Sequence, residues 1–255
     1  ATNGYGVWVQ YKSGRVGAIN LSPKSARGSG GASALANAAL PTYGVGTRRA
    51  LILAPYAEQL KKMGGDEAVK AGDDLKAREC PPFAVDTFTD NKAILSHFRN
   101  MSEYGVVAIS SHGDAMFQGM STPDKQALNW EHHGSQEVLW SGEPVNCNAL
   151  SSKKGTCNKA GGGCPAGQEC VKTSTAGGVC VDHTQGDIMT GRVAIGADNY
   201  AVLPSFIPRH AKRDFPDSIV YLGACRTLWN GSLASQLYGL GVQAIVGYSD
   251  YVSNK

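Results

Sequence analysis

The run SIVYLGACRT, residues 218–227, decides the fold of this 255-residue chain. It opens with a short, continuously apolar stretch, which is typical of a strand buried on both faces of a sheet. It then passes through two small residues to Cys225 and a polar turn. A second run of the same form, VVAISSHGD (106–114), ends on His112 and Gly113. The sequence therefore predicts two core strands, each followed directly by residues that can carry chemistry.

Strands and helices alternate outward from these two runs. Three more apolar runs predict strands: RALILAPY (49–56), FAVDTFT (83–89) and VQAIVGYS (242–249). Amphipathic spacing predicts helices near 65–79, over 92–104 and over 232–240, and residues 192–207 have some β character. This alternation indicates an α/β fold with a mostly parallel sheet and helices on both faces. Ligands of such sheets bind at the carboxyl ends of the strands.

The first 47 residues differ from the rest. Residues 5–21 alternate and break at Lys12-Ser13-Gly14, which predicts a β-hairpin. Residues 22–47 are rich in Ser, Ala and Gly, as in an exposed linker. We therefore separate an N-terminal segment, 1–47, which could serve as an inhibitory pro-segment, from a main domain, 48–255.

Composition excludes several classes of protein. Hydrophobic residues make up 42% of the chain, too many for a disordered protein. The net charge of +3 does not gather into a Lys/Arg stripe, so nucleic acid is not an expected partner. No apolar run approaches the ~18–20 residues of a membrane span. The chain also lacks the Gly-x-x-x-x-Gly-Lys-Ser/Thr loop that binds nucleotides and the Gly-x-Ser-x-Gly elbow of serine hydrolases.

Five of the seven cysteines fall in one stretch that is poor in large apolar side chains, KKGTCNKAGGGCPAGQECVKTSTAGGVCVD (153–182) and the residues before it. Zinc is an alternative, but the cysteines are not spaced about two to four residues apart as in zinc knuckles. Disulfides, and hence export to an oxidising compartment, are favoured. The stretch then forms a disulfide-held insertion at about 145–185. The cysteines predicted to be bridged, in an order left open, are Cys80, Cys147, Cys157, Cys164, Cys170 and Cys180.

If six of the seven cysteines form disulfides, Cys225 is left unpaired. A free cysteine is often a small buried hydrophobe. Here, however, His112 leaves a neighbouring strand at the same edge, and an imidazole can activate a thiol nucleophile. The backbone N–H groups of Gly113 and Cys225 could stabilise an oxyanion, because glycine permits close approach of a substrate carbonyl.

Strand–His-Gly followed by strand–Ala-Cys resembles the caspase-fold (clan CD) cysteine peptidases. The likeness covers about residues 48–251 and is greatest on the gingipain, clostripain and CHAT-protease side, where a small-residue helix and a strand follow the cysteine, as in GSLASQLYGLGVQAIVGYSD (231–250). The resemblance implies a caspase-like three-layer fold, Cys225 as nucleophile, His112 as general base and acid, and Gly113 as oxyanion donor. It also implies an exported bacterial thiol protease made as a zymogen.

The resemblance has one departure. The family's sheet normally has a sixth strand, whereas this chain stops just after the fifth predicted strand of the main domain. We therefore expect either a separately processed C-terminal chain or a truncated domain.

The substrate is less well defined. Asp250, in the loop after the last strand, could receive an Arg or Lys before the scissile bond, and Gly223 would line the same pocket beside the nucleophile. Alternatively, Asp250 is a loop or capping carboxylate.

No metal or cofactor is required by the expected chemistry. Adjacent side chains such as Glu131-His132-His133 diverge and do not form a metal motif. Asp182, Asp187 and Asp198 could hold structural calcium, but their spacing fits no recognised loop, so calcium stays unassigned.

Together these features predict a secreted cysteine endopeptidase that hydrolyses peptide bonds through a thioester on Cys225. Its partners would be protein or peptide substrates. The alternative is a catalytically silent module of the same fold that recognises a protein partner.

Overall fold

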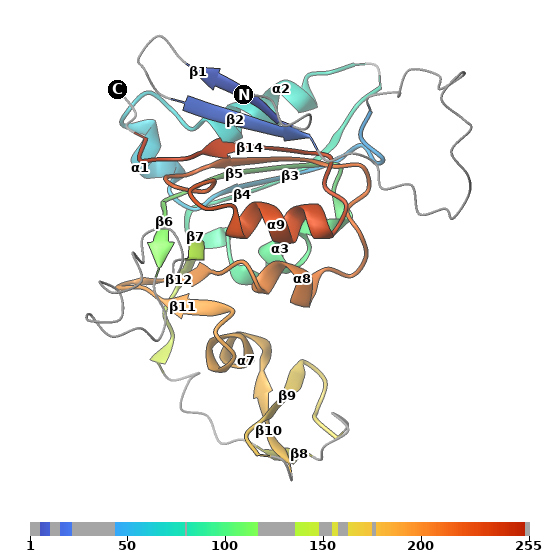
Figure 1. Ribbon diagram of the computed structural model, residues 1–255, viewed down its shortest axis with the longest axis vertical. Coiled ribbons are helices and arrows are strands. Elements are labelled where there is room, and N and C mark those ends of the chain that lie inside the picture. The colour runs from blue at the N-terminus through green and yellow to red at the C-terminus, as the bar shows by residue number, and fades with distance from the viewer. Residues whose placement is uncertain are drawn as a thin grey trace.

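A computed structural model describes residues 6–10, 16–21, 44–79, 81–116, 136–147, 155–157, 163–174 and 177–252. In these residues the main body is a seven-stranded sheet in the order β1-β2-β14-β13-β5-β3-β4 (Figure 1). Its strands are β1 (Gly6–Gln10), β2 (Val16–Leu21), β3 (Arg49–Ala54), β4 (Ala84–Thr89), β5 (Val106–Ser110), β13 (Ile219–Gly223) and β14 (Ala244–Tyr248). The five strands from β14 to β4 are all parallel, which confirms the predicted mostly parallel sheet.

Helices cover both faces of this sheet (Figure 1). On one face, α2 (Glu67–Lys76) packs Ala68 against Ile52 and Ala108. On the other face lie α3 (Leu95–Arg99), α8 (Phe206–His210) and α9 (Ser232–Gly239), with the larger part of the core between them and the sheet. No helix in the described ranges is both long and apolar enough to cross a bilayer.

The helix predicted over 92–104 is wrong as a single element. The structure divides this stretch into the short 3-10 helices η1 (Asp90–Lys92) and η2 (Met101–Glu103) with α3 between them. Ala93 leaves helical geometry at ψ 66°. The backbone N–H of Leu95 then donates to the Glu143 carboxylate at 2.8 Å, so a distant side chain starts α3 afresh.

The N-terminal hairpin belongs to the central sheet. β2 lies antiparallel beside β14, with Leu21 opposite Ala244 and Gly17 opposite Tyr248. β2 therefore occupies the position next to β14 in the sheet, between β14 and β1. Residues 22–43, most of the predicted linker, lie outside the described residues.

A second, antiparallel sheet of order β11-β12-β7-β6 adjoins the first. Its strands are β6 (Gly113–Met116), β7 (Gln136–Pro144), β11 (Val193–Ile195) and β12 (Asn199–Val202). The β character expected over 192–207 is confirmed by β11 and β12. β6 begins directly after His112, so the chain leaves the central sheet and enters the second sheet at that residue.

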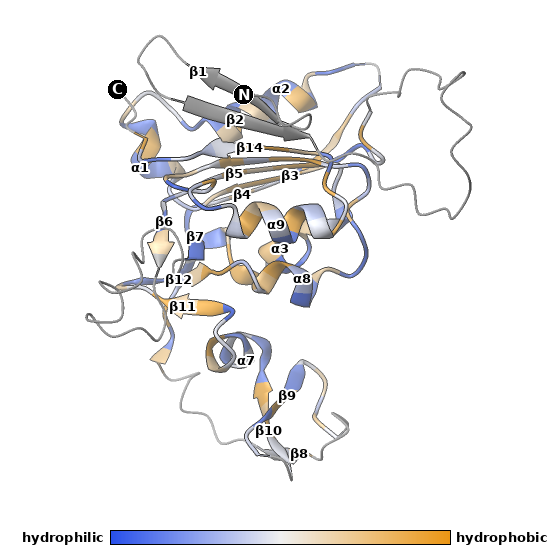
Figure 2. Cartoon of the chain, viewed as in Figure 1, coloured by the Kyte–Doolittle hydropathy of each residue, from blue (hydrophilic) through white to orange (hydrophobic). Residues whose placement is uncertain are grey.

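The cysteine-rich insertion forms a three-stranded sheet of β8 (Gly155–Cys157), β10 (Gly178–Asp182) and β9 (Gln168–Lys172). Figure 2 shows that β9 and the helix α7 (His183–Met189), which follows β10, are largely hydrophilic. Two disulfides, Cys157–Cys170 and Cys164–Cys180, compensate for the small apolar content, and the prediction of disulfide bonds is confirmed.

The expected third bridge does not form among the described residues. Cys147 is an exposed free thiol, and Cys80 lies outside them. The two observed bridges already connect β8 to β9, and β10 to the loop before β9. The two disulfides therefore cross-link this sheet without Cys147.

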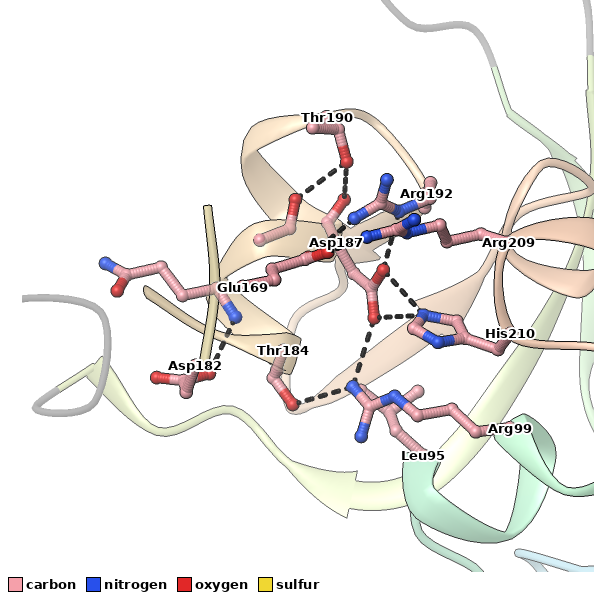
Figure 3. A network of polar contacts seen from close by, with 12 residues as sticks. Leu95, Arg99, Glu169, Asp182, Thr184, Asp187, Thr190, Arg192, Arg209 and His210 are labelled. Atoms are coloured by element: carbon pink, nitrogen blue, oxygen red, sulfur yellow. Dashed lines mark hydrogen bonds and ion pairs between the residues drawn. The ribbon is translucent and has the colours of Figure 1, made fainter. Parts of the chain in front are cut away.

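Charged residues fasten this insertion to the main body (Figure 3). Asp187 on α7 has a fully buried side chain that lies 3.0 Å from Arg99 of α3, 2.6 Å from Arg192 and 2.8 Å from His210 of α8. Burial by itself would raise the pKa of Asp187, but the hydrogen bonds from His210, Arg192 and Arg99 outweigh it and hold that pKa below its ordinary value.

A second buried carboxylate extends the same network. Glu169 of β9 pairs with Arg192 at 2.7 Å and with Arg209 at 2.5 Å. Arg192 therefore bridges the two acids, one from the insertion sheet and one from α7 (Figure 3). Of the aspartates considered for calcium, Asp187 is engaged in this way, and Asp182 caps α7 by accepting from the N–H of Gln185.

Candidate active site

β5 and β13 are hydrogen-bonded neighbours whose last residues, Ser110 and Gly223, stand opposite each other. The pairing continues one step further, because the N–H of Ser111 donates to the carbonyl of Gly223 at 3.1 Å. The two chain segments that carry His112 and Cys225 therefore leave the sheet side by side. In Figure 1 this is the end of the sheet where α1 and β6 lie.

Gly113 touches the backbone of the cysteine. A Cβ added to Gly113 would overlap the carbonyl oxygen of Cys225 and would lie 2.9 Å from the Ala224 side chain and 3.2 Å from the Cys225 nitrogen. Only glycine allows this approach, so the structure brings the predicted residues Gly113 and Cys225 into direct contact.

The N–H of Gly113 is directed away from β7. Gly113 stands opposite Leu139, and the flanking N–H of Trp140 donates to the carbonyl of His112 at 3.1 Å. Gly113 is therefore in a non-hydrogen-bonded pair of the antiparallel ladder, whose N–H groups point outward. In the described residues β6 is the edge strand, so this N–H faces out of the second sheet.

His112 sits on the surface against residues that follow β3. Its Nε2 lies 3.3 Å from Oε1 of Gln59, and its ring meets the Tyr56 ring edge-on at 4.3 Å between centroids. Gln59 belongs to the short helix α1 (Ala57–Lys61). Partial burial of the imidazole lowers the pKa of His112 below its ordinary value, which favours the neutral form that can accept a proton.

Cys225 lies in a turn that is tied to the end of β14. Its half-buried Sγ accepts from the N–H of Val252 at 3.4 Å. The fully buried Thr227 hydroxyl donates to Leu222 and accepts from the N–H of Tyr248, which joins the turn to both β13 and β14. The thiol is thus held by the backbone and stays partly accessible.

The helix after this turn is held by a buried acid. Glu137 of β7 is fully buried and accepts hydrogen bonds from the N–H groups of Asn230, Gly231 and Leu233 at 2.8, 2.9 and 2.6 Å. These are donors at the start of α9, where a helix has unpaired N–H groups. The second sheet therefore fixes where the segment after Cys225 enters α9.

Asp250 and Gly223, the two predicted substrate contacts, have different surroundings. Asp250 has a 75% exposed side chain that lies 4.0 Å from Nε of Arg226. It also accepts from the N–H of Tyr251, as the capping alternative requires. Gly223 is buried, its carbonyl is taken by Ser111, and a Cβ there would lie 2.7 Å from the Glu67 carboxylate, so its smallness serves packing.

Three further residues at the site were missed from the sequence. Tyr56 and Gln59 lie a few residues after the end of β3 at Ala54, and Gln59 belongs to the short helix α1, which the sequence did not predict. Arg226 follows Cys225 and adopts a left-handed backbone conformation with φ 56°. Glu131-His132-His133, considered for a metal, lie outside the described residues.

One group in the described ranges has metal-like spacing. Sulfur atoms of Cys157, Cys164 and Cys180 all lie within 4.8 Å of one another. All three belong to the two disulfides of the insertion, where the sulfur is not a thiolate that can bind a metal.

Compared with models of known protein families, with curated proteins and with solved structures, the chain matches none of them.

Proposed function

We propose that this protein is a cysteine endopeptidase whose nucleophile is Cys225 and whose general base and acid is His112. The observation that carries the proposal is the contact of Gly113 with the Cys225 backbone, at the ends of two neighbouring parallel strands. Gly113 directly follows His112, so this contact supports a proposed site that combines the Gly113 N–H, the Cys225 thiol and the His112 imidazole. Acyl transfer by a thiol needs these three groups.

In the proposed reaction the Cys225 thiol gives its proton to His112, and the sulfur attacks the carbonyl carbon of the scissile peptide. A C–S bond forms, and the carbonyl electron pair moves to oxygen. The N–H groups of Gly113 and Cys225 donate to that oxyanion. When the carbonyl re-forms, the C–N bond breaks, and His112 returns the proton to the leaving amine.

The resulting thioester is then hydrolysed. His112 takes a proton from water, the oxygen of which attacks the thioester carbon. The C–S bond breaks, and Cys225 regains a proton as the product carboxylate leaves. A neutral imidazole is needed at the start of this step, and the lowered pKa of His112, which results from its partial burial, favours that form.

Export forms part of the proposal. Two disulfides in a small, hydrophilic insertion are typical of proteins from oxidising compartments. The insertion would then serve as a surface module beside the peptidase domain.

Thiol alkylation tests the proposal inside one molecule. Cys225 is half-buried, whereas Cys147 is an exposed free thiol that provides a standard of ordinary reactivity. After limited treatment with iodoacetamide, peptide mass spectrometry should show Cys225 labelled faster than Cys147, despite its smaller exposure. The variant His112→Ala should slow the labelling of Cys225 and leave that of Cys147 unchanged.

A peptide-library digest completes the test. The wild-type protein should cut the library, and Cys225→Ala should not. If Cys225 reacts more slowly than Cys147, is insensitive to His112→Ala and no peptide is cut, the peptidase proposal fails. The same outcome would favour the silent binding module, which agrees with the fact that His112 and Cys225 each hydrogen-bond to another residue, Gln59 and Val252.

A further inference from the structure

Four sulfur atoms gather in the cysteine-rich insertion. Those of Cys157, Cys164 and Cys180 all lie within 4.8 Å of one another, and the sulfur of Cys170 is bonded to that of Cys157. We refer to Cys157, Cys164, Cys170 and Cys180 as the sulfur cluster. In a tetrahedral zinc site made of four cysteines, Zn–S bonds of about 2.3 Å place the sulfur atoms about 3.8 Å apart. The sulfur cluster is therefore already close to the dimensions of such a site.

The register of the strands brings three of these cysteines to one face of the insertion sheet. Cys170 of β9 stands directly opposite Cys180 of β10, and cross-strand partners project to the same face. Cys157 of β8 stands opposite Gly178, which lies two residues before Cys180 on β10 and so belongs to that face as well. Cys164 joins the cluster from the loop before β9. The backbone pairing thus directs the cysteines together in addition to the two bridges.

The insertion needs a cross-link in either redox state. It is small and its strand β9 is largely hydrophilic (Figure 2), so disulfides or a metal must supply the stability that a large core would give. When both bridges are reduced, four thiols remain in one place without a covalent link. Soft thiolate ligands select ions such as Zn²⁺, and a bound zinc ion stabilises a small fold directly.

The charge of the insertion suits a zinc ion with four thiolates, which together carry two negative charges. Residues 153–182 contain four lysines and two acidic residues, an excess of two positive charges. One of the acids, Glu169, is already paired with Arg192 and Arg209. The surrounding chain therefore offsets the charge of the metal complex.

We infer that the sulfur cluster is a redox-controlled zinc site: with both bridges reduced it binds one Zn²⁺ through four thiolates, and re-formation of the bridges releases the ion. Two molecules of a dithiol reduce the two bridges, each giving two electrons and two protons and ending as a disulfide. Zn²⁺ then displaces the four thiol protons. In the reverse direction, two molecules of a disulfide oxidant accept four electrons as both S–S bonds form and Zn²⁺ leaves. No step involves Cys225 or His112, so the site is independent of the proposed peptidase function.

Cobalt spectroscopy tests this site in the full chain. The parent protein carries Cys80→Ser, Cys147→Ser and Cys225→Ser, so that its only cysteines are those of the sulfur cluster. After reduction with dithiothreitol and removal of the reagent under argon, titrated Co²⁺ should give the charge-transfer and d–d absorption of a tetrahedral thiolate site, saturating at one ion per chain. Zn²⁺ should displace it with a Kd of about 1 nM or below, as in structural zinc sites. The unreduced parent should bind neither ion.

A shifted cysteine distinguishes a folded site from chelation by a loose chain. Val179→Cys combined with Cys180→Ser keeps four cysteines but moves one thiol to the opposite face of β10, because neighbouring residues of a strand project to opposite sides. This variant should bind Co²⁺ about 100-fold or more weakly than the parent, since changes outside the ligand set already cost about 10- to 100-fold. If it binds Co²⁺ as the parent does, the inference is overturned.

Oxidation completes the test. Glutathione disulfide added to the zinc-loaded parent should release one Zn²⁺ per chain to a coloured chelator, and peptide mapping should then find Cys157–Cys170 and Cys164–Cys180. Failure of the reduced parent to bind Co²⁺, or retention of Zn²⁺ after both bridges have formed, overturns the inference. Because the parent lacks Cys225, such a failure is distinct from a failure of the alkylation test of the proposed nucleophile.

Discussion

The carbonyl oxygen of Cys225 occupies the space that a side chain on Gly113 would need. One residue follows His112 and the other is the proposed nucleophile, so the spacing of these two backbones sets the geometry of the oxyanion site. A side chain at position 113 should therefore lower activity, although glycine itself contributes no side chain to the reaction.

Gly113→Ala should lower kcat/KM by about 100-fold or more, because displacing reacting groups by about 1 Å is enough to do so. Circular dichroism and peptidase assays on the purified variant measure this. The matched change Gly239→Ala, at the end of α9, meets no atom within 4 Å and should alter the free energy of unfolding by no more than about 1 kcal/mol. An active Gly113→Ala enzyme would show that the contact does not matter for catalysis.

Gln59→Glu should raise the pKa of His112. In the wild-type protein the pKa of His112 lies below its ordinary 6.5, so protonation should reduce kcat/KM only below that pH. A carboxylate in place of the amide, whose Oε1 lies 3.3 Å from Nε2, favours the imidazolium and should shift the acidic limb upward by about one pH unit.

The His112 ring protons report the same pKa by NMR titration, even in an inactive protein. Gln236→Glu, the same substitution on α9, should leave both the titration and the rate profile where they were. If Gln59→Glu also leaves the His112 titration and the rate profile unchanged, Gln59 does not contact the imidazole in solution.

Asp187→Asn should weaken attachment of the cysteine-rich insertion. It leaves Arg99, Arg192 and His210 without their shared acid, and losing one partner of a buried ion pair typically costs about 3–5 kcal/mol. Urea unfolding and limited proteolysis of residues 155–182 measure the loss. The exposed Asp74→Asn is the control.

The pH dependence has a defined sign. Because the pKa of Asp187 in the folded protein lies below its ordinary 3.8, its contribution to stability is fully present above that pH and is lost as the pH falls through the lower, folded value. The free energy of unfolding of the wild-type protein should therefore fall more steeply in acid than that of Asp187→Asn. Parallel curves would mean that the network contributes nothing.

Glu137→Gln should destabilise the start of α9. The carboxylate accepts from three backbone N–H groups, and an amide nitrogen in place of one oxygen leaves donors facing a donor, at a typical cost of about 1–3 kcal/mol. Thermal unfolding measures this, with the exposed Glu79→Gln as reference. Because Glu137 holds the segment after Cys225, the alkylation rate of Cys225 should also change in Glu137→Gln but not in Glu79→Gln.

The parallel strands could be predicted because each is a short apolar run with its own local pattern. The placement of His112, Gly113 and Cys225 at one edge followed from the direction of those strands. β7 could not be found in this way. It buries Glu137 and Ser141, and these polar residues have their partners far away in the chain, such as Leu233 and Tyr200.

The other residues of the site are brought together by contacts that no periodic sequence pattern predicts. Gln59 is an exposed polar residue whose meeting with His112 depends on how α1 is set after β3. Arg226 meets Trp229 nearby in the chain, but Asp114 and Tyr251 are brought to it only by the tertiary fold. Cys147 was expected to be bridged because six cysteines can form three pairs, but it is a free thiol. An even number of cysteines does not require that each of them forms a disulfide.

The placement of β2 beside β14 has a consequence for how the protein would withstand proteolytic nicking. The hairpin contributes a full ladder from Gly17 to Leu21 along β14. Without it, the strand AIVGY would present bare N–H and C=O groups, a template for aggregation. A cut anywhere between Leu21 and Gly44 should therefore yield two fragments that stay associated through this ladder, so that cleavage seen on a denaturing gel need not release the N-terminal piece in solution.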